Sequence, residues 1–176
     1  IKKGEGAFYG PKIDIDVEDA LGRKWQCPTC QLDFNLPQRF ETTYVDENSK
    51  KQTAVMIHRA ILGSLERFFG IMTEHYAGKF PLWLSPEQVR IVTIANRFDD
   101  YAESVKKKLF EHDIRAATDF RQETLNKKVR EAEIARVNYI IVVGEKELDN
   151  KTINVRTRDN KVLGEKNVDE FLKQLL

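Results

Sequence analysis

The run VMIHRAILGSLERF, residues 55–68, constrains the fold of this chain more than any other segment. It opens with the β-rich apolar pattern of a strand, places His58 and Arg59 side by side, and continues as an amphipathic helix. After these two residues apolar side chains recur at roughly helical spacing, which predicts a helix that starts directly there and extends to about Tyr76. On that phase Arg67 falls beside the apolar face, where an unpaired guanidinium is costly to bury. Such an arginine reaches water or meets an anionic or aromatic partner.

Composition sets modest limits. At 176 residues the chain has room for one large domain or two small ones. Because 29 lysines and arginines balance 28 acidic residues, overall charge does not indicate a nucleic-acid partner, and only local clusters could. The sequence contains no apolar run long enough to span a membrane and no signal peptide pattern. It begins with Ile1 rather than methionine, so we expect a fragment of a longer protein.

Two cysteines, Cys27 and Cys30, form a lone CxxC. A structural zinc site needs four ligands, and the sequence has no second Cys or His pair at matching spacing. A thioredoxin-like redox pair follows a strand and opens a helix, whereas the residues on both sides here predict strand. We therefore expect two free thiols, buried or half-buried, in a protein of the cytoplasm, where thiols stay reduced.

The residue pattern divides near position 85, and the part before it predicts strands and turns. Apolar residues alternate with aspartates in KIDIDVED, residues 12–19, as in a half-buried strand. The expected elements are a strand at 12–19, a turn at 21–23, a return strand at 25–34, an interruption at 35–37, a polar loop at 46–52 and an interdomain connector at 81–88.

After the connector the pattern changes to alternating strands and helices. The run YIIVVG at 139–144 is fully apolar, as a central parallel strand should be. Asn167 followed three residues later by Glu170 is a capping signature for a final helix that ends at Leu176. We therefore predict a compact α/β domain with a mixed sheet over 87–176. Its other expected elements are strands at 89–95 and 114–120, helices at 99–112 and 124–136, and an edge hairpin from 152–158 with a return near Val162.

Three segments are informative together, namely GAFYGPKIDI at 6–15, KWQCPTCQLDF at 24–34 and VMIHRAILGSLERF at 55–68. They resemble segments of class II aminoacyl-tRNA synthetases, and of the threonyl-tRNA synthetase family in particular. The last resembles motif 3, with His-Arg-Ala at 58–60, and the three occur in the family's order. The resemblance covers essentially the whole chain. It implies an α+β fold for 1–86, namely a partial antiparallel catalytic sheet with the motif 3 helix, followed by an α/β anticodon-binding domain at 87–176.

The resemblance also implies a reaction and its residues. Enzymes of this family activate threonine with ATP, accompanied by Mg²⁺, to threonyl-adenylate and transfer it to tRNA(Thr). Arg67 takes the place of the motif 3 arginine, whose guanidinium stacks on adenine and helps to hold phosphate charge. On the residues alone it is equally a surface ion pair with Glu66 or Glu74. The other positions that match catalytic, substrate or ATP contacts are Gln26, Gln31, Tyr9, Lys12, Thr29 and Ser64.

A lone histidine at a strand–helix junction is usually hydrogen-bonded locally. The resemblance implies that His58 is one of three protein ligands to a catalytic zinc ion, the other two lying upstream. An open zinc position can bind the amino and hydroxyl groups of threonine, and valine cannot complete that coordination. The motif 2 arginine and the motif 1 dimer element also belong upstream. We therefore predict that this chain alone neither activates threonine nor holds zinc well.

The second half carries the RNA-binding prediction. Two basic segments expected at the same end of the α/β domain could form an RNA-facing patch, and the alternative is a solvated surface. They comprise Lys151, Arg156, Arg158 and Lys161 in one segment and Arg121, Lys127, Lys128 and Arg130 in the other. By resemblance, Gln122, Glu147 and Arg156 lie where the family reads unstacked anticodon bases.

Two alternatives stay open. One is a non-catalytic module that binds tRNA or another RNA, and the other is a class II synthetase of the prolyl or histidyl type, against which the context of His58 argues. The resemblance implies a homodimeric parent enzyme. An isolated first half would expose a sheet edge and an apolar face with Trp25 and Phe34, so we expect it to be covered by another chain, partly disordered, or part of a longer protein.

Overall fold

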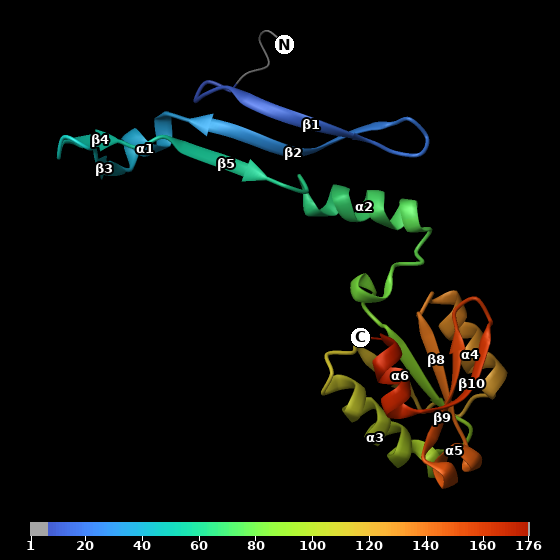
Figure 1. Cartoon of the computed structure of the whole chain (residues 1–176). Helices are drawn as coiled ribbons and strands as arrows, with labels where there is room; N and C mark the ends of the chain where they lie inside the picture. The colour runs from blue at the N-terminus through green and yellow to red at the C-terminus, as the bar shows by residue number, and fades with distance from the viewer. Residues whose placement is uncertain (1–6, 176) are drawn as a thin grey trace. The chain divides into compact units, whose positions relative to one another are not determined.

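The computed structural model describes residues 7–175 and shows two compact units that divide between His75 and Tyr76 (Figure 1). Each unit has its own sheet. Within the described residues, none of the helices has the length and apolar character needed to cross a membrane.

The first unit is built on a three-stranded antiparallel sheet in the order β1-β2-β5 (Figure 1). The strands are β1 (Lys12–Glu18), β2 (Lys24–Asp33) and β5 (Met56–Ala60). The expected hairpin is confirmed, and Asp19 and Gly22 close its turn through a backbone hydrogen bond. Both faces of the sheet lack a covering layer, because the described part of this unit buries only Cys27, Asp33 and Pro37.

Opposite residues in an antiparallel pair share one face of the sheet. Lys12 lies opposite Gln31, which in turn lies opposite His58. On the other face Leu32 lies opposite Ile57, which is exposed. One face of this sheet is therefore polar and the other is apolar.

Two short elements differ from the sequence prediction. The interruption at 35–37 is a helix, α1 (Asn35–Arg39), because the Asp33 carboxylate accepts hydrogen bonds from the first two helical N–H groups at 2.8 and 2.9 Å. The predicted polar loop at 46–52 is shorter than expected, since β3 (Thr43–Val45) and β4 (Lys51–Thr53) pair as a hairpin.

The helix of the 55–68 run begins later than predicted. It is α2 (Leu65–Tyr76), and its end agrees with the prediction. Gly63 has φ +70°, and a Cβ there would lie 2.8 Å from the carbonyl oxygen of Cys27, so the chain turns tightly before the helix. Ser64 Oγ then accepts the N–H of Arg67 at 3.2 Å and caps the first turn.

The second unit is a five-stranded mixed sheet in the order β10-β9-β8-β6-β7. Strand β6 pairs in parallel with β7 and β8, while β9 is antiparallel to β8 and β10, which confirms the mixed sheet and its edge hairpin. The strands are β6 (Val89–Thr93), β7 (Ala116–Asp119), β8 (Tyr139–Val143), β9 (Thr152–Thr157) and β10 (Val162–Asn167).

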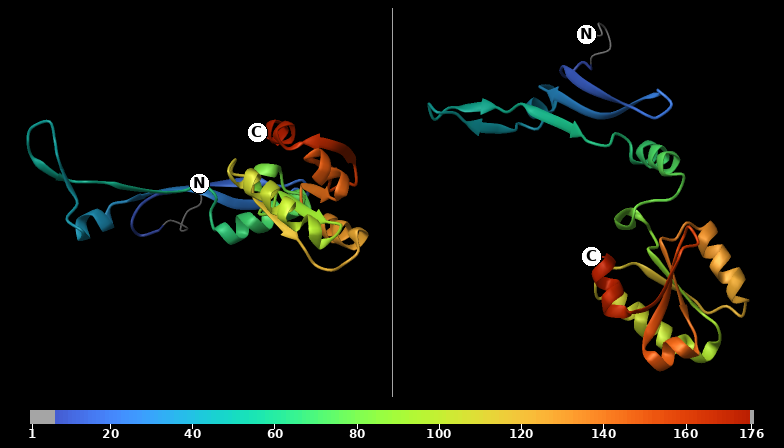
Figure 2. Two further views of the ribbon diagram at one scale, coloured as in Figure 1. Left: turned by 90° about the horizontal axis from the view of Figure 1, so that it is seen from below. Right: turned by 45° about the vertical axis from the view of Figure 1, so that its right-hand side comes forward.

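Helices cover both faces of this sheet (Figure 2). The helices are α3 (Asp99–Phe110), α4 (Leu125–Ile134), α5 (Glu145–Asn150) and α6 (Val168–Leu175). Helices α3 and α6 pack on one face through residues such as Leu109 and Phe171, and α4 packs on the other through Val129. Helix α5 was not predicted, and the predicted end of α6 at Leu176 lies outside the described residues.

The predicted connector is held to the second unit. The carbonyl oxygen of Phe80 accepts hydrogen bonds from Asn138 Nδ2 at 3.1 Å and from Arg158 Nη1 at 2.7 Å. Arg115 donates to the carbonyl oxygens of Trp83 and Ser85 at 2.8–3.0 Å. A 3₁₀ turn (Leu82–Leu84) lies between these anchors.

Candidate functional site

A pocket of about 420 Å³ opens beside the polar face of the first sheet. Tyr9 Oη donates to Gln31 Oε1 at 3.1 Å, and Gln31 stands opposite His58 in the strand register. The structure thus brings together three of the predicted site residues from three separate segments. The lining residues are Phe8, Tyr9, Gln31, Asp33, Asn35, Leu36, Arg39 and His58.

Asp33 lies beneath this pocket and was not predicted as a site residue. Its side chain is 1% exposed, and its Oδ2 lies 2.9 Å from His58 Nε2. Burial raises the pKa of the Asp33 carboxyl, but the hydrogen bonds from His58 and from the N–H groups of Leu36 and Asn35 outweigh it and hold that pKa below its usual range. An ionised carboxylate only accepts hydrogen bonds, so His58 Nε2 is the donor in this contact.

A signal for Asp33 was present in the sequence. An aspartate at the end of a strand, two residues before a short polar segment, is typical of a helix cap. Arg39 also lines the pocket and was missed, because residues 35–37 were interpreted as an interruption of the strand and not as the start of a helix.

Arg67, Gln26 and Ser64 lie together at the start of α2. Arg67 Nη1 donates to the backbone carbonyl of Gln26 at 3.3 Å, and its own N–H donates to Ser64 Oγ. The predicted alternative was an ion pair of Arg67 with Glu66 or Glu74. No salt bridge of Arg67 with either is found among the described residues, and Glu74 pairs with Arg23 at 2.7 Å. Arg67 is an exposed residue.

Lys12 and Thr29 are joined through Asp14. Lys12 Nζ and Thr29 Oγ1 each lie 2.8 Å from the Asp14 carboxylate. Thr29 Oγ1 also lies 3.3 Å from the carbonyl oxygen of Ile13. Lys12 and Thr29 are not among the residues that line the pocket, although Lys12 stands opposite Gln31, which does.

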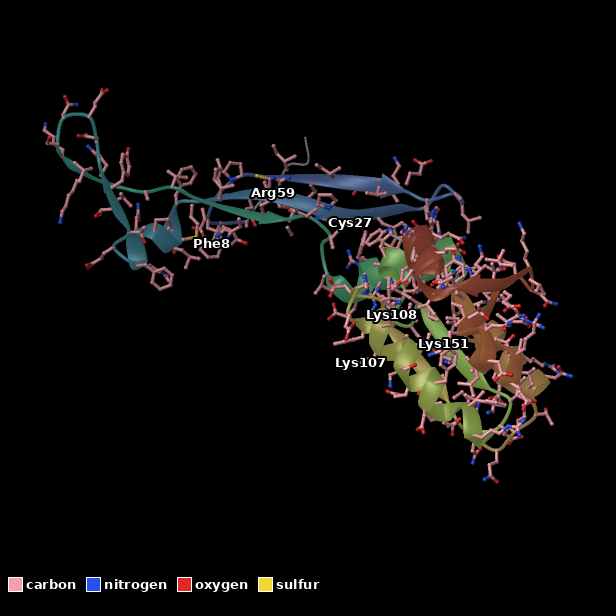
Figure 3. The ribbon with its side chains drawn as sticks, turned by 60° about the horizontal axis from the view of Figure 1, so that its bottom comes forward. Phe8, Cys27, Arg59, Lys107, Lys108 and Lys151 are labelled. Carbon is pink, nitrogen blue, oxygen red and sulfur yellow. The ribbon has the colours of Figure 1, made fainter. Side chains whose placement is uncertain are left out.

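The cysteines are both free, as predicted, but they differ in exposure. Cys27 is buried, whereas Cys30 is exposed, so the expectation of two buried or half-buried thiols is wrong for Cys30. Cys30 stands opposite Ile13 and Arg59, on the same face of the sheet as Leu32 and Ile57. Figure 3 labels Cys27, Arg59 and Phe8. Of these, Phe8, which lines the pocket, is 87% exposed. The described residues contain no group of three or more His, Cys, Asp or Glu side chains placed to hold a metal ion.

In the second unit, Gln122 and Glu147 follow β7 and β8, which both pair in parallel with β6. Both therefore lie near the carboxyl ends of the parallel strands. Gln122 is exposed, whereas Glu147 is buried and its Oε2 accepts the N–H of Gly144 at 3.0 Å. Arg156 lies within β9 and is half-buried.

Of the predicted basic segment around the start of α4, Arg121, Lys127 and Arg130 are exposed, whereas Lys128 is buried. Arg121 donates to both carboxylate oxygens of Asp119, at 2.9 and 2.6 Å, and to Glu131 at 2.6 Å. These carboxylates raise the pKa of the Arg121 guanidinium, and Arg121 lowers the pKa of the Asp119 carboxyl. Lys128 is 3% exposed, and its Nζ donates to the carbonyl oxygens of Thr93 and Asp119. Arg121 and Lys128 thus make intramolecular contacts within this unit.

Two further cations have partners within the unit. Lys127 pairs with Glu123 at 2.6 Å, and Arg158 donates to the connector. Arg130, Lys151 and Lys161 are exposed, and Lys151 is labelled in Figure 3. The basic segment at 151–161 thus keeps an accessible positive surface.

Residues 88–176 match the family model described as anticodon binding domain. The chain belongs to this family of anticodon binding domains. Residues 1–76 match a second model, described as tRNA synthetase class II core domain (G, H, P, S and T). The predicted class II synthetase fold is therefore confirmed.

The relatives agree along the whole chain. The threonine–tRNA ligase of Finegoldia magna is 52% identical over 176 residues, which cover 100% of this chain and 28% of that protein. The threonine–tRNA ligase of Protochlamydia amoebophila is 52% identical over 175 residues, or 99% of this chain and 27% of that protein. The chain thus spans little more than a quarter of the length of the curated relatives that it matches.

A solved structure has the same fold. The RNA binding domain of threonyl-tRNA synthetase from Cryptosporidium parvum Iowa II matches with a TM-score of 0.83 and 42% identity over 98% of this chain and 44% of that chain. The predicted relation to the threonyl-tRNA synthetases is confirmed.

Proposed function

We propose that this chain is the C-terminal part of a threonine–tRNA ligase, with the end of the catalytic domain at 1–86 and the anticodon-binding domain at 87–176. The observation that carries the proposal is the gathering of Tyr9, Gln31 and His58 around one pocket. In the proposed reaction the threonine carboxylate attacks the α-phosphate of ATP and pyrophosphate leaves. A ribose hydroxyl of tRNA(Thr) then takes the acyl group and AMP leaves.

His58 is proposed as one of three zinc ligands. Metal-binding histidines usually donate their other N–H to a carboxylate or carbonyl, and the contact between His58 Nε2 and Asp33 fits that rule. The nitrogen left for the metal is Nδ1. Zinc would supply an open position for the amino and hydroxyl groups of threonine. The remaining two ligands would come from the part of the protein that precedes this chain.

The residues near α2 and β1 are proposed to serve ATP and the adenylate. Arg67 is exposed and has a planar guanidinium that can stack on adenine, and its bond to the carbonyl of Gln26 orients it. Mg²⁺ would accompany the ATP phosphates. Charge stabilisation and positioning do most of the work in such transfers. The other proposed contacts are Tyr9, Lys12, Thr29, Gln31 and Ser64.

The second unit is proposed to read the tRNA anticodon with Gln122, Glu147 and Arg156. Unstacked loop bases expose edges that amide, carboxylate and guanidinium groups can recognise. One oxygen of Glu147 is held by Gly144, which fixes the orientation of the other. A homodimeric parent protein and a cytoplasmic location complete the proposal.

Anticodon binding is the direct test. The 176-residue chain would be titrated with the anticodon stem-loop of tRNA(Thr) and with stem-loops carrying one replaced anticodon base. We expect a preference for the unchanged stem-loop that Arg156→Ala lowers roughly tenfold at one position. Lys107→Ala, on α3 (Figure 3), removes one exposed positive charge elsewhere and should leave the preference unchanged. Equal binding of all stem-loops would leave only a basic surface.

The catalytic half has its own test. Because the chain spans 27–28% of its relatives, we expect no threonine-dependent exchange of pyrophosphate into ATP by the chain alone. Exchange above the level without threonine would show that the upstream residues are not needed.

A further inference from the structure

Two buried polar atoms of β9 have no hydrogen-bond partner among the described residues. They are Oδ1 of Asn154, which is an acceptor, and Nε of Arg156, whose N–H is a donor. A third such atom, Oδ1 of Asn138, belongs to an amide whose Nδ2 donates to Phe80. Unpaired buried polar atoms are rare in folded proteins, because each loses its water without gaining a partner.

Asn154 and Arg156 stand on the same face of β9. They are two positions apart in a strand, which places their Cα atoms roughly 7 Å apart with side chains on one side. On β8 the opposite residues are Val142 and Ile140, and on β10 the residue opposite Arg156 is Val162. None of these three side chains can accept or donate a hydrogen bond.

Glu165 is the polar side chain opposite Asn154 on β10, and it is already engaged. Its carboxylate accepts from Asn150 Nδ2 at 2.9 Å and from Thr152 Oγ1 at 2.7 Å, and it pairs with Lys146 at 2.9 Å. The residues opposite them in the strand register therefore offer no free hydrogen-bond partner. Asn154 Oδ1 and Arg156 Nε can bond only to each other, to water or to a ligand.

We propose that Asn154 is a positioning residue for Arg156. When Arg156 engages RNA, Asn154 Oδ1 accepts the Nε–H, and the two Nη groups then point as a fork toward one base edge. A fork of this kind matches the paired acceptors of a purine, and its selectivity depends on a fixed orientation. The inference rests on the proposed function, in which Arg156 reads an anticodon base.

The test uses the 176-residue chain and the stem-loops described above. Asn154→Leu and Asn154→Ala both remove the acceptor, and Asn154→Asp retains it. We expect the first two to lower the preference at the position read by Arg156 roughly tenfold, as Arg156→Ala does. Asn154→Asp should keep the preference, although its charge weakens binding to every RNA. The double variant Asn154→Leu/Arg156→Ala should be no less selective than Arg156→Ala alone.

Stability separates positioning from a structural role. Replacing an unpaired buried acceptor with an apolar group of similar size should leave the thermal midpoint of Asn154→Leu at or above that of the unchanged chain. If Asn154→Leu and Asn154→Ala keep the preference, or if Asn154→Asp loses it as they do, the inference is overturned while the anticodon-reading proposal stands. If the unchanged chain has no preference, or Arg156→Ala keeps it, both fail.

Discussion

The two units of this chain differ greatly in how much apolar surface they bury. The second unit buries residues of three strands and three helices in two clusters. The described part of the first unit buries three residues, and it exposes Ile13, Ile57 and Phe34. A sheet with two open faces depends on surfaces that another part of the protein supplies. The second unit therefore has its own core, and the first carries part of a site without the core to support it.

The largest expected difference concerns independent folding. Residues 76–176 should fold cooperatively on their own, whereas residues 1–75 should not, because they lack a buried core. Urea unfolding followed by circular dichroism would show one transition for the former and none for the latter. A polypeptide of 89–176, which lacks the hydrogen bonds at Phe80 and Ser85, should be measurably less stable than 76–176. A cooperative transition in residues 1–75 would contradict this comparison.

A matched pair of isoleucines sharpens the comparison at single residues. Ile141 is fully buried in β8, whereas Ile57 is 62% exposed in β5. Ile141→Ala should lower the free energy of unfolding by about 2–5 kcal/mol. Ile57→Ala should change it by less than about 0.5 kcal/mol. Chemical unfolding of the whole chain measures both, and equal losses would mean that the first unit has a core after all.

Neighbouring lysines on α4 give a third contrast. Lys128→Met leaves two buried carbonyl oxygens, of Thr93 and Asp119, without a donor, which should cost about 1–3 kcal/mol of stability. Lys127→Met removes an exposed pair with Glu123 and should have almost no effect. The same unfolding experiment applies, and a Lys128→Met protein as stable as Lys127→Met would show that the buried ammonium is not needed.

The smallest expected effect is a pH dependence. Hydrogen bonds from Lys146, Thr152 and Asn150 lower the pKa of Glu165 from 4.5 to about 2. Because the folded pKa lies below the unfolded one, this carboxylate adds stability above about pH 4.5 and loses it as the pH falls toward 2. Glu165→Gln should flatten the fall in stability within that window, measured by urea unfolding at several pH values. An unchanged pH profile would contradict the assignment.

The second unit was largely predictable from the sequence. Apolar runs such as 139–144 fill a core that this unit completes by itself, so their periodicity reports real burial. In the first unit the pattern was less informative. The apolar spacing after Arg59 predicted a helix that starts five residues too early, because spacing does not show the positive φ of Gly63 or the cap of Ser64. Trp25, expected on the exposed face, is half-buried, and its Nε1 donates to Asp19.

The site was predictable only as a set of residues. Sequence alone does not give strand register, so it could not show that Gln31 faces both Lys12 and His58. The resemblance supplied those residues, and their roles remain proposals. The resemblance also omitted Asp33, whose importance comes from a contact across 25 positions. Counting basic residues misjudged Lys128, since burial depends on the fold and not on composition.

The internal pairing around α4 has a consequence for polyelectrolyte behaviour. The salt dependence of RNA affinity counts the counterions that protein cations release from phosphates. Arg121 already holds Asp119 and Glu131, and Lys128 is sealed from solvent. The charge of Arg121 is largely balanced by these carboxylates, and Lys128 cannot reach a phosphate without first leaving its buried position. The slope of log affinity against log salt should therefore reflect exposed cations such as Lys151 and Lys161, and should be shallower than the basic residues in the sequence suggest.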